Sequence, residues 1–316
     1  MKSVGKSTRK YLGEFILYKQ SLGYIYGTQS IYLKRYVDYE EAHDKQGILS
    51  KESIDNYLAL LKDAPGSLYG TVSALREFSR YLVNHGIPAY TIPAKTVFQP
   101  IPEPSYFFTE NEIERFFQEA DCIELLSRYK GREIMIPVFY RLMCCCGIRC
   151  KEARMLLRQD VLLKEKYIDI MKSKGEKDRR IYITEELKDH LTHYDDAISK
   201  IYPEREYFFP GFGSKSYLSE SFVCGNFETL WGQAFPDMPK EHYPRAYDFR
   251  HHFAWANINR WASESMDVNV MLPYLMRYMG HATVKQTLYY FHFVPEFYAP
   301  YREMTEDLED ILPEVL

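Results

Sequence analysis

Three short segments in the second half of the 316-residue chain carry residues that could do chemistry together. Arg149 follows a glycine at the end of an apolar segment, Arg250 opens another apolar segment, and His281 precedes Tyr290 by nine residues. Guanidinium groups are always ionised and can hold an anion through two parallel hydrogen bonds, while a tyrosine oxygen can act as a nucleophile. Taken singly, these residues have ordinary interpretations: a solvated surface arginine, a capping histidine, and one of 28 tyrosines. Their significance therefore depends on their order along the chain.

In that order, the segments resemble the catalytic domain of the tyrosine recombinase (phage integrase) family. The family carries a Gly-(Leu/Ile)-Arg-x-x-Glu box, a lysine in a β-hairpin, a His-x-x-Arg-His box, and Leu-Gly-His with a tyrosine nine residues later. The matching residues here are Arg149, Glu152, Lys174, Arg250, His251, His281 and Tyr290. The spacing selects Tyr290 over its neighbour Tyr289.

The resemblance implies attack of a tyrosine oxygen on a DNA phosphodiester through a covalent 3′-phosphotyrosine intermediate. Such a transesterification conserves the energy of the bond, so neither ATP nor a metal is needed and no cofactor is expected. Arg149 and Arg250 would hold the nonbridging phosphate oxygens, and His281 would add a hydrogen bond. Lys174 would protonate the leaving 5′ oxygen while Tyr290 attacks.

Tyr247 marks a departure from the family pattern, which usually has a histidine three residues before the second arginine. A phenol titrates at about pH 10 and is a poor general base at neutral pH. Tyr247 therefore either positions the site, or the base function lies elsewhere or is dispensable. Glu152, one helical turn after Arg149, would orient that arginine or a neighbouring histidine, unless it is a plain surface acid. His251 is a supporting candidate.

Neither the histidines nor the cysteines form a metal-binding pattern. His251 and His252 are adjacent, so they diverge on a helix, and no carboxylate stands at ligand spacing. Four of the six cysteines crowd into one stretch: Cys144, Cys145, Cys146 and Cys150. Successive residues on a helix point about 100° apart. These thiols therefore cannot converge on one ion, and we expect them to be small apolar packing residues without a metal.

The acidic charge of the chain is concentrated at its carboxyl end. The formal net charge is −4, yet residues 1–100 carry 13 basic against 9 acidic residues, and residues 295–316 carry 1 against 7. A negative total therefore does not exclude a basic surface elsewhere. By resemblance, the expected partner is double-stranded DNA, bound by a homotetramer or by a hetero-assembly with sister recombinases. The candidate phosphate contacts are Lys6, Arg9, Lys10, Lys34, Arg35, Arg76, Arg80, Lys172, Lys177 and Arg179.

The spacing of apolar residues predicts a helical N-terminal domain and a separate second domain. Four helical segments within residues 1–87, the third after a candidate N-cap at Ser50, predict a compact bundle. By resemblance, this bundle would be the family's SAM-like core-binding domain, which binds DNA. Residues 88–105 contain five prolines and no periodicity, which predicts an extended interdomain linker.

Residues 106–294 are expected to form the tyrosine-recombinase catalytic domain, mostly α with a small antiparallel sheet. Thr109 and Glu112 have the spacing of a capping box. Two β-like runs, 167–171 and 180–184, flank a polar turn that contains Lys174, with Lys172 and Lys177 as competitors for its role. The acidic tail, 295–316, would contact a neighbouring protomer, unless it is a disordered solubilising end.

The composition is that of an ordinary globular protein, with 46% hydrophobic and 27% charged residues. No apolar run reaches the roughly 18 residues of a membrane span, and the first residues lack the apolar core of a signal peptide. We therefore expect a cytoplasmic protein without a membrane partner.

The expected function is site-specific recombination, with integration or excision of a mobile element as the preferred role. That preference rests on Tyr247, because chromosome-dimer resolvases of the family usually retain the histidine that it replaces. A recombinase that resolves chromosome or plasmid dimers is the second hypothesis within the family. The same residues would also suit a non-catalytic DNA-binding regulator on this scaffold, or a type IB topoisomerase, which relaxes supercoils without strand exchange.

Overall fold

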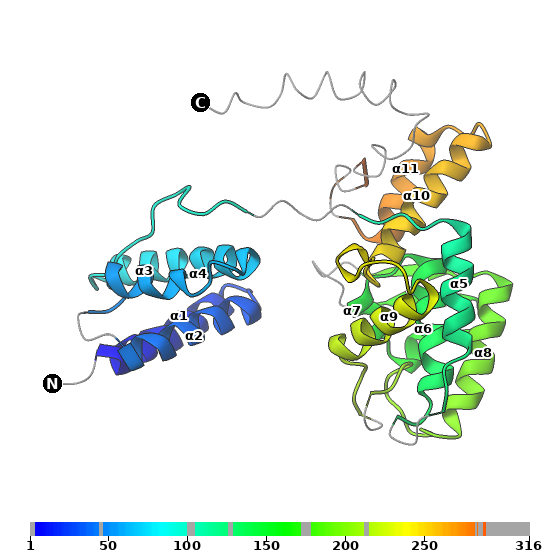
Figure 1. Ribbon diagram of the computed structural model, residues 1–316, viewed down its shortest axis with the longest axis horizontal. Coiled ribbons are helices and arrows are strands. Elements are labelled where there is room, and N and C mark those ends of the chain that lie inside the picture. The colour runs from blue at the N-terminus through cyan, green and yellow to red at the C-terminus, as the bar shows by residue number, and fades with distance from the viewer. Residues whose placement is uncertain are drawn as a thin grey trace. The chain divides into compact units, whose positions relative to one another are not determined.

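The computed structural model describes residues 4–43, 47–99, 105–125, 129–171, 178–211, 215–281, 283 and 287–288, with the side chains of 4–7 left out. The chain divides into two compact units, Met1–Glu103 and Pro104–Leu316, each with its own buried core. Both are dominated by helices (Figure 1). None of the helices within these described ranges has the length and apolarity needed to cross a bilayer.

Within its described residues, the first unit has four helices, as the spacing of apolar residues predicts. They are α1 (Val4–Ser21), α2 (Gly27–His43), α3 (Lys51–Ala59) and α4 (Pro65–Asn84). Their buried faces meet around Phe15, Tyr36 and Phe78. The predicted N-cap is confirmed, since the Ser50 hydroxyl accepts a hydrogen bond from the Ser53 amide at 3.1 Å.

The first part of the proline-rich segment is not free linker but belongs to the first unit. Ile92 is buried in its core, and the Tyr90 amide donates to the carbonyl of Leu49 at 3.0 Å. Arg76 donates to the carbonyls of Ile92 and Pro93 at 3.0 and 2.9 Å. The first half of the predicted linker, 88–105, thus packs on the bundle through an apolar residue among the prolines, and the domain boundaries stay predictions.

The second unit consists of helices with one small sheet. Its helices are α5 (Glu110–Asp121), α6 (Arg132–Cys146), α7 (Cys150–Arg154), α8 (Glu185–Ser199), α9 (Glu220–Ala234), α10 (Asp248–Ser263) and α11 (Val268–Met279), with 3-10 turns η1 (Arg158–Asp160) and η2 (Lys240–His242). Strands β1 (Val161–Leu162), β2 (Tyr167–Ile170) and β3 (Arg179–Tyr182) pair antiparallel in that order. The predicted hairpin is confirmed, with Ile168 opposite Ile181. The capping box at the start of α5 is confirmed as well.

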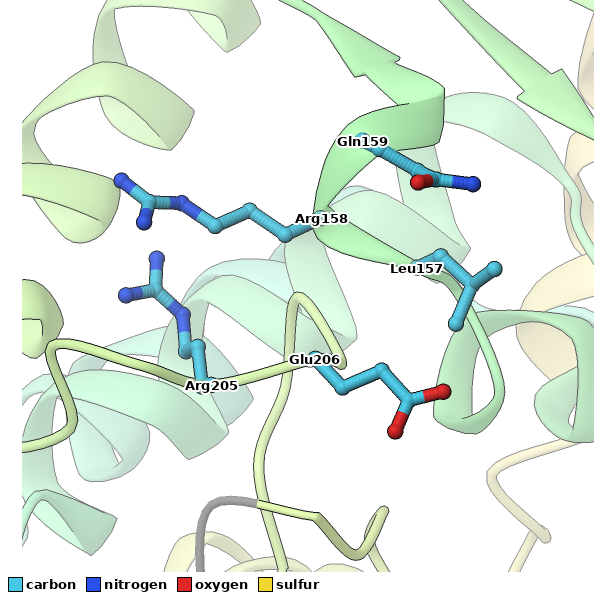
Figure 2. Close-up of a pocket in the computed structure, with 5 residues that line it drawn as sticks. All are labelled: Leu157, Arg158, Gln159, Arg205 and Glu206. Carbon is cyan, nitrogen blue, oxygen red and sulfur yellow. The ribbon is translucent and has the colours of Figure 1, made fainter.

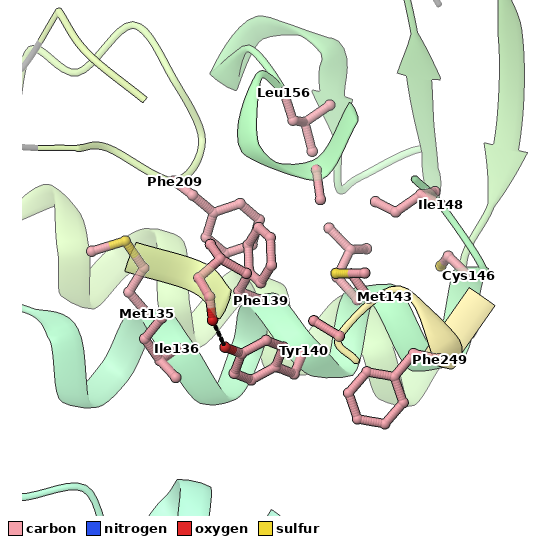
Figure 3. Close-up of a cluster of buried hydrophobic side chains, with 14 of the residues drawn as sticks. Met135, Ile136, Phe139, Tyr140, Met143, Cys146, Ile148, Leu156, Phe209 and Phe249 are labelled. Carbon is pink, nitrogen blue, oxygen red and sulfur yellow. Dashed lines mark hydrogen bonds between the residues drawn. The ribbon is translucent and has the colours of Figure 1, made fainter. Parts of the chain in front are cut away.

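Helix α6 lies in the main core of the second unit and packs against α5, α8 and α10. Figure 3 shows its buried side chains, among them Phe139, Tyr140 and Met143, facing Phe209 and Phe249. The Tyr140 hydroxyl is buried and donates to the carbonyl of Val223 at 2.6 Å, so the polar group of this core residue is satisfied. Helices α10 and α11 pack together over a smaller apolar cluster (Figure 1).

Candidate active site

Two helices of the second unit end at glycines in the left-handed conformation, and the candidate site is built on these ends. Gly147 (φ 56°) ends α6, and Arg149 follows it as the N-cap of α7. Gly280 (φ 65°) ends α11, and His281 follows it directly. A Cβ at position 147 would lie 2.4 Å from the ring of Phe253, so glycine is required there by space as well as by backbone.

Arg149 is held by hydrogen bonds at both the main chain and the guanidinium. Its amide donates to Glu152 Oε2 at 2.9 Å and its Nη1 to Glu152 Oε1 at 2.7 Å. Its Nη2 donates to the carbonyl of Gly280 at 2.8 Å. The guanidinium is therefore fixed between the start of α7 and the end of α11.

Arg250 joins the same two helix ends from α10. Only 1% of the residue is exposed, and its Nη1 and Nη2 each donate at 2.6 Å, to the carbonyls of Gly147 and Met279. Carbonyls at a helix C-terminus carry partial negative charge, which favours a cation there. The ends of α6 and α11 thus hold Arg250 close to Arg149, with both bound to the Met279–Gly280 turn.

Glu152 is the acid of this cluster and is shared by two arginines. Arg179, at the start of β3, donates to Oε1 and Oε2 of Glu152 at 3.0 and 2.7 Å, and its Nε donates to the carbonyl of Tyr278 at 2.8 Å. Burial alone would raise the pKa of Glu152, but the hydrogen bonds and charge of Arg179, followed by the hydrogen bonds from the amide and side chain of Arg149, lower the pKa to about 2. Glu152 is therefore ionised, and it is no plain surface acid.

Arg179, which was predicted to contact DNA, has a buried side chain in the structure. Its side chain is only 6% exposed, and its guanidinium donates to Glu152 and to the carbonyl of Tyr278. The side chain of Arg179 is buried because side chains along a strand point alternately to opposite faces of the sheet, so Arg179 lies on the same face as buried Ile181.

His281 is half-buried beside the arginines. Its Nδ1 lies 2.7 Å from the hydroxyl of Thr287, which is fully buried. Burial, followed by the charges of Arg250, Arg149 and Arg179, lowers the pKa of His281 to about 3. The ring is therefore neutral at physiological pH, and the hydroxyl partner on Nδ1 can set which ring nitrogen carries the proton.

Tyr247 and His251 lie together at the start of α10. Their rings meet edge to face at 5.0 Å, and Tyr247 is 41% exposed. Burial lowers the pKa of His251 to about 4, with Asp248 opposing and Arg245 and Arg250 adding to the decrease. The structure thus gives Tyr247 a packing contact with a neutral imidazole.

Several predicted residues lie outside the described part of the chain. They are Tyr290 and its neighbour Tyr289, the hairpin residues Lys172, Lys174 and Lys177, the side chain of Lys6, and the tail 295–316. Among the remaining DNA candidates, Lys10, Lys34, Arg35 and Arg80 are exposed on the first unit. Arg9 is exposed as well, but it is bound to Asp38 and Glu41, each at 2.6 Å. The DNA contacts of the first unit stay predictions.

The histidines and cysteines do not assemble into a metal centre in the described ranges, where no group of three His, Cys, Asp or Glu side chains is placed to hold an ion. Burial raises the pKa of Cys146 to about 12 and, with smaller effects from neighbouring charges, that of Cys150 to about 11. Cys144 is half-buried and Cys145 exposed, so the row of thiols is only partly in the core.

A cavity of about 520 Å³ is lined by none of the predicted site residues. Figure 2 shows its lining, with the guanidiniums of Arg158 and Arg205 extending side by side. Both bind the carboxylate of Asp195 on α8, Arg158 at 3.0 Å. These ion pairs thus connect the loop after α8 and the η1 turn to α8.

Sequence reasoning missed two members of the site, Arg179 as its buried support and Thr287 as the partner of His281. The first had a usable signal in the period of the strand, where alternate residues share a face. For Thr287, the sequence offered no signal beyond its position six residues after His281, in a stretch without clear periodicity.

Comparisons with known proteins agree with this architecture. The model of the phage integrase family matches residues 106–296. The protein named "Putative integrase/recombinase y4rE" of Sinorhizobium fredii (strain NBRC 101917 / NGR234) is 23% identical over 290 residues, which cover 89% of this chain and 91% of that protein. XerH site-specific recombinase bound to its difH substrate has a similar fold, with a TM-score of 0.64 at 16% identity over 92% and 94% of the two chains. The integrase of transposon Tn1549 in complex with transposon right-end DNA gives 0.62 at 15% identity over 96% and 99%. The predicted fold class is confirmed.

Proposed function

This chain belongs to the phage integrase family of tyrosine recombinases, and from that premise we propose that it cuts and rejoins DNA strands at specific sites. The observation that supports the proposal is the convergence of Arg149, Arg250 and His281 on two adjoining helix ends. Arg149 and Arg250 are 101 positions apart in sequence, yet both donate to backbone carbonyls of the Met279–Gly280 turn. His281 is the next residue after that turn.

In the proposed reaction, the Tyr290 oxygen attacks the phosphorus of a DNA phosphodiester and the 5′ oxygen leaves. The tyrosine loses its proton to water, Lys174 supplies one to the 5′ oxygen, and a 3′-phosphotyrosine bond replaces the bond that is broken. Arg149 and Arg250 stabilise the charge on the nonbridging oxygens. Because both are already fixed by backbone carbonyls, little reorganisation is needed when the phosphate arrives.

His281 is suited to donate a hydrogen bond to the same phosphate while it is neutral. If the hydroxyl of Thr287 donates to Nδ1, the proton of the ring resides on Nε2, the other nitrogen. A phosphate anion at that nitrogen would offset the positive charges that keep the pKa of His281 low.

The covalent adduct is the decisive test of this proposal. A nicked suicide duplex, built from the recombination junction mapped on genomic DNA beside the gene, traps a phosphotyrosine because the severed end diffuses away. We expect a protein–DNA adduct from the wild type and from Tyr289→Phe, and none from Tyr290→Phe. An adduct that survives Tyr290→Phe moves the nucleophile to another residue. Sequence-specific gel shifts with no adduct from the wild type would favour a non-catalytic DNA-binding regulator.

The biological role that we propose is integration or excision of a mobile element by a tetramer on double-stranded DNA, with the tail 295–316 contacting a neighbouring protomer. The support is Tyr247, which stands where chromosome-dimer resolvases of the family usually have histidine. Sequencing of the mapped junction tests this role. Joints between element ends and varied flanking DNA are expected, whereas joints between two identical chromosomal sites would favour dimer resolution.

A further inference from the structure

Arg179 occupies a position that the proposed reaction does not yet explain. It is a cation buried beneath the cluster of Arg149, Arg250 and His281. We propose that Arg179 is a positioning residue, which fixes Glu152 and the end of α11 so that Arg149 is presented to the phosphate. The inference deepens the proposed function and rests on it.

The hydrogen bonds of Glu152 link Arg179 to Arg149 directly. Oε1 accepts from Nη1 of both arginines, at 2.7 Å from Arg149 and 3.0 Å from Arg179. Oε2 accepts from the Arg149 amide at 2.9 Å and from Arg179 Nη2 at 2.7 Å. Each carboxylate oxygen is therefore shared, and a shift of Arg179 would release the acid that orients Arg149.

Arg179 also supports the turn from which the other site groups extend. Its Nε donates to the carbonyl of Tyr278 at 2.8 Å. A Cβ at Gly280 would lie only 3.1 Å from Arg179 Nη1 and 3.3 Å from its Cδ and Cζ, so the guanidinium packs tightly against that glycine. The Gly280 carbonyl accepts from Arg149, and His281 follows, so one side chain supports two phosphate-binding groups.

The neighbouring Arg180 provides a matched control within the same strand. Arg180 also donates two hydrogen bonds to a carboxylate, that of Asp169, at 2.8 and 2.9 Å. Its guanidinium lies 3.6 Å from the ring centre of Tyr167. Its side chain is 46% exposed and points to the opposite face of the sheet. The two arginines thus differ in face and burial but not in residue type or kind of partner.

Loss of Arg179 should also change how Glu152 titrates. Arg149 and Arg179 both lower the pKa of Glu152, and Arg179 has the larger effect. Burial acts in the opposite direction, so without Arg179 the pKa of Glu152 would rise. As the pH falls, cleavage by an Arg179 variant should therefore be lost at a higher pH than cleavage by the wild type.

Single-turnover cleavage of the nicked junction duplex tests the inference. We expect Arg179→Met to slow adduct formation by about 10–100-fold, the size of effect that slight misplacement of a catalytic group produces. Arg179→Lys, which keeps the charge but not the two-pronged contact, should slow it by about 10-fold. Arg180→Met and Arg180→Lys should stay within about twofold of the wild type. Equal losses in the two pairs of variants would overturn the inference.

DNA affinity separates positioning from direct contact. A buried positioning residue leaves the dissociation constant for the same duplex and its salt dependence unchanged. A phosphate contact would weaken binding and reduce the salt slope by about one. The second result would show that Arg179 acts on DNA itself, against the inference.

The Glu152 carboxyl supplies a readout that needs no DNA. In ¹³C NMR of the full chain labelled at glutamate carboxyls, the signal that Glu152→Gln removes identifies Glu152. Its titration midpoint should be higher in Arg179→Met than in the wild type and unchanged in Arg180→Met; an unchanged midpoint in Arg179→Met overturns the inference. If Arg179→Met fails to fold, the Arg179→Lys and Arg180→Lys pair decides the same question. Absence of an adduct from the wild type would refute the proposed function alone.

Discussion

Lowering the pH from about 7.5 to about 5 should destabilise the second unit through the two histidines beside Arg250. Burial and neighbouring arginines lower the pKa of His281 to about 3 and that of His251 to about 4. In an unfolded chain, both would titrate at about 6.5. Below that pH, the two histidines bind protons in the unfolded state but stay neutral in the folded state. Stability is therefore full above about 6.5 and is lost as the pH falls toward the folded values.

The magnitude follows from the width of that window. Each pH unit below 6.5 costs about 1.4 kcal/mol for a fully buried ring, or about 2 kcal/mol at pH 5. Both rings are only half-buried, so we reduce this to about 1 kcal/mol each for solvent screening. The total of about 2 kcal/mol corresponds to a fall in Tm of about 4–8 °C for a unit of this size. Glu152 does not contribute, because its lowered pKa affects stability only below about 4.5.

Scanning calorimetry across this pH range measures the effect. His281→Gln should reduce the pH dependence in the transition of the second unit without abolishing it, because burial also lowers the pKa of His251 and of His252. His190→Gln, which changes an exposed histidine on α8, should leave the dependence unchanged. A wild-type Tm that does not move between about pH 7 and pH 5, or a His281→Gln variant with the full dependence, would refute the reasoning.

Three further substitutions test other parts of the site, and a fourth, at Gly225, is a control for the glycine change. Thr287→Val removes the hydroxyl that pairs with the histidine Nδ1, and should slow single-turnover cleavage by about 10-fold while DNA affinity is unchanged. Gly147→Ala places a Cβ 2.4 Å from Phe253 at a φ of 56°, and should cost about 2–4 kcal/mol in thermal unfolding. Gly225→Ala, whose Cβ would meet nothing within 4 Å inside α9, should instead stabilise by about 0.5–1 kcal/mol. Tyr247→Phe should keep adduct formation within about threefold, because the ring packing against His251 does not need the hydroxyl; a loss of about 100-fold would assign the hydroxyl an acid–base role.

The local parts of this fold can be predicted from sequence because short-range chemistry determines them. Glycines end α6 and α11 in the left-handed conformation that favours glycine, and Thr109 with Glu112 caps α5 through its own side chains. Arg149 and His281 follow these glycines, and their order along the chain together with Arg250 carries the family resemblance that selected them.

The missed parts depend on contacts between distant segments. Whether Arg179 or Arg180 faces inward depends on which side of β3 the helices cover, although Ile181 supplied a hint. The two-residue strand β1 is too short to show a period of its own. The packing of Ile92 on the first unit was hidden among prolines that predict extended chain.

The anchors of Arg250 have a consequence for how freely this region can diverge. The groups that it binds at Gly147 and Met279 are main-chain oxygens, which every amino acid provides. Exchange of Met279 for another apolar residue would leave its oxygen in place, provided that α11 still ends at the next residue. Saturation mutagenesis should therefore find position 279 permissive and positions 147, 250 and 280 restrictive. A geometry maintained in this way can persist while most of the surrounding sequence drifts.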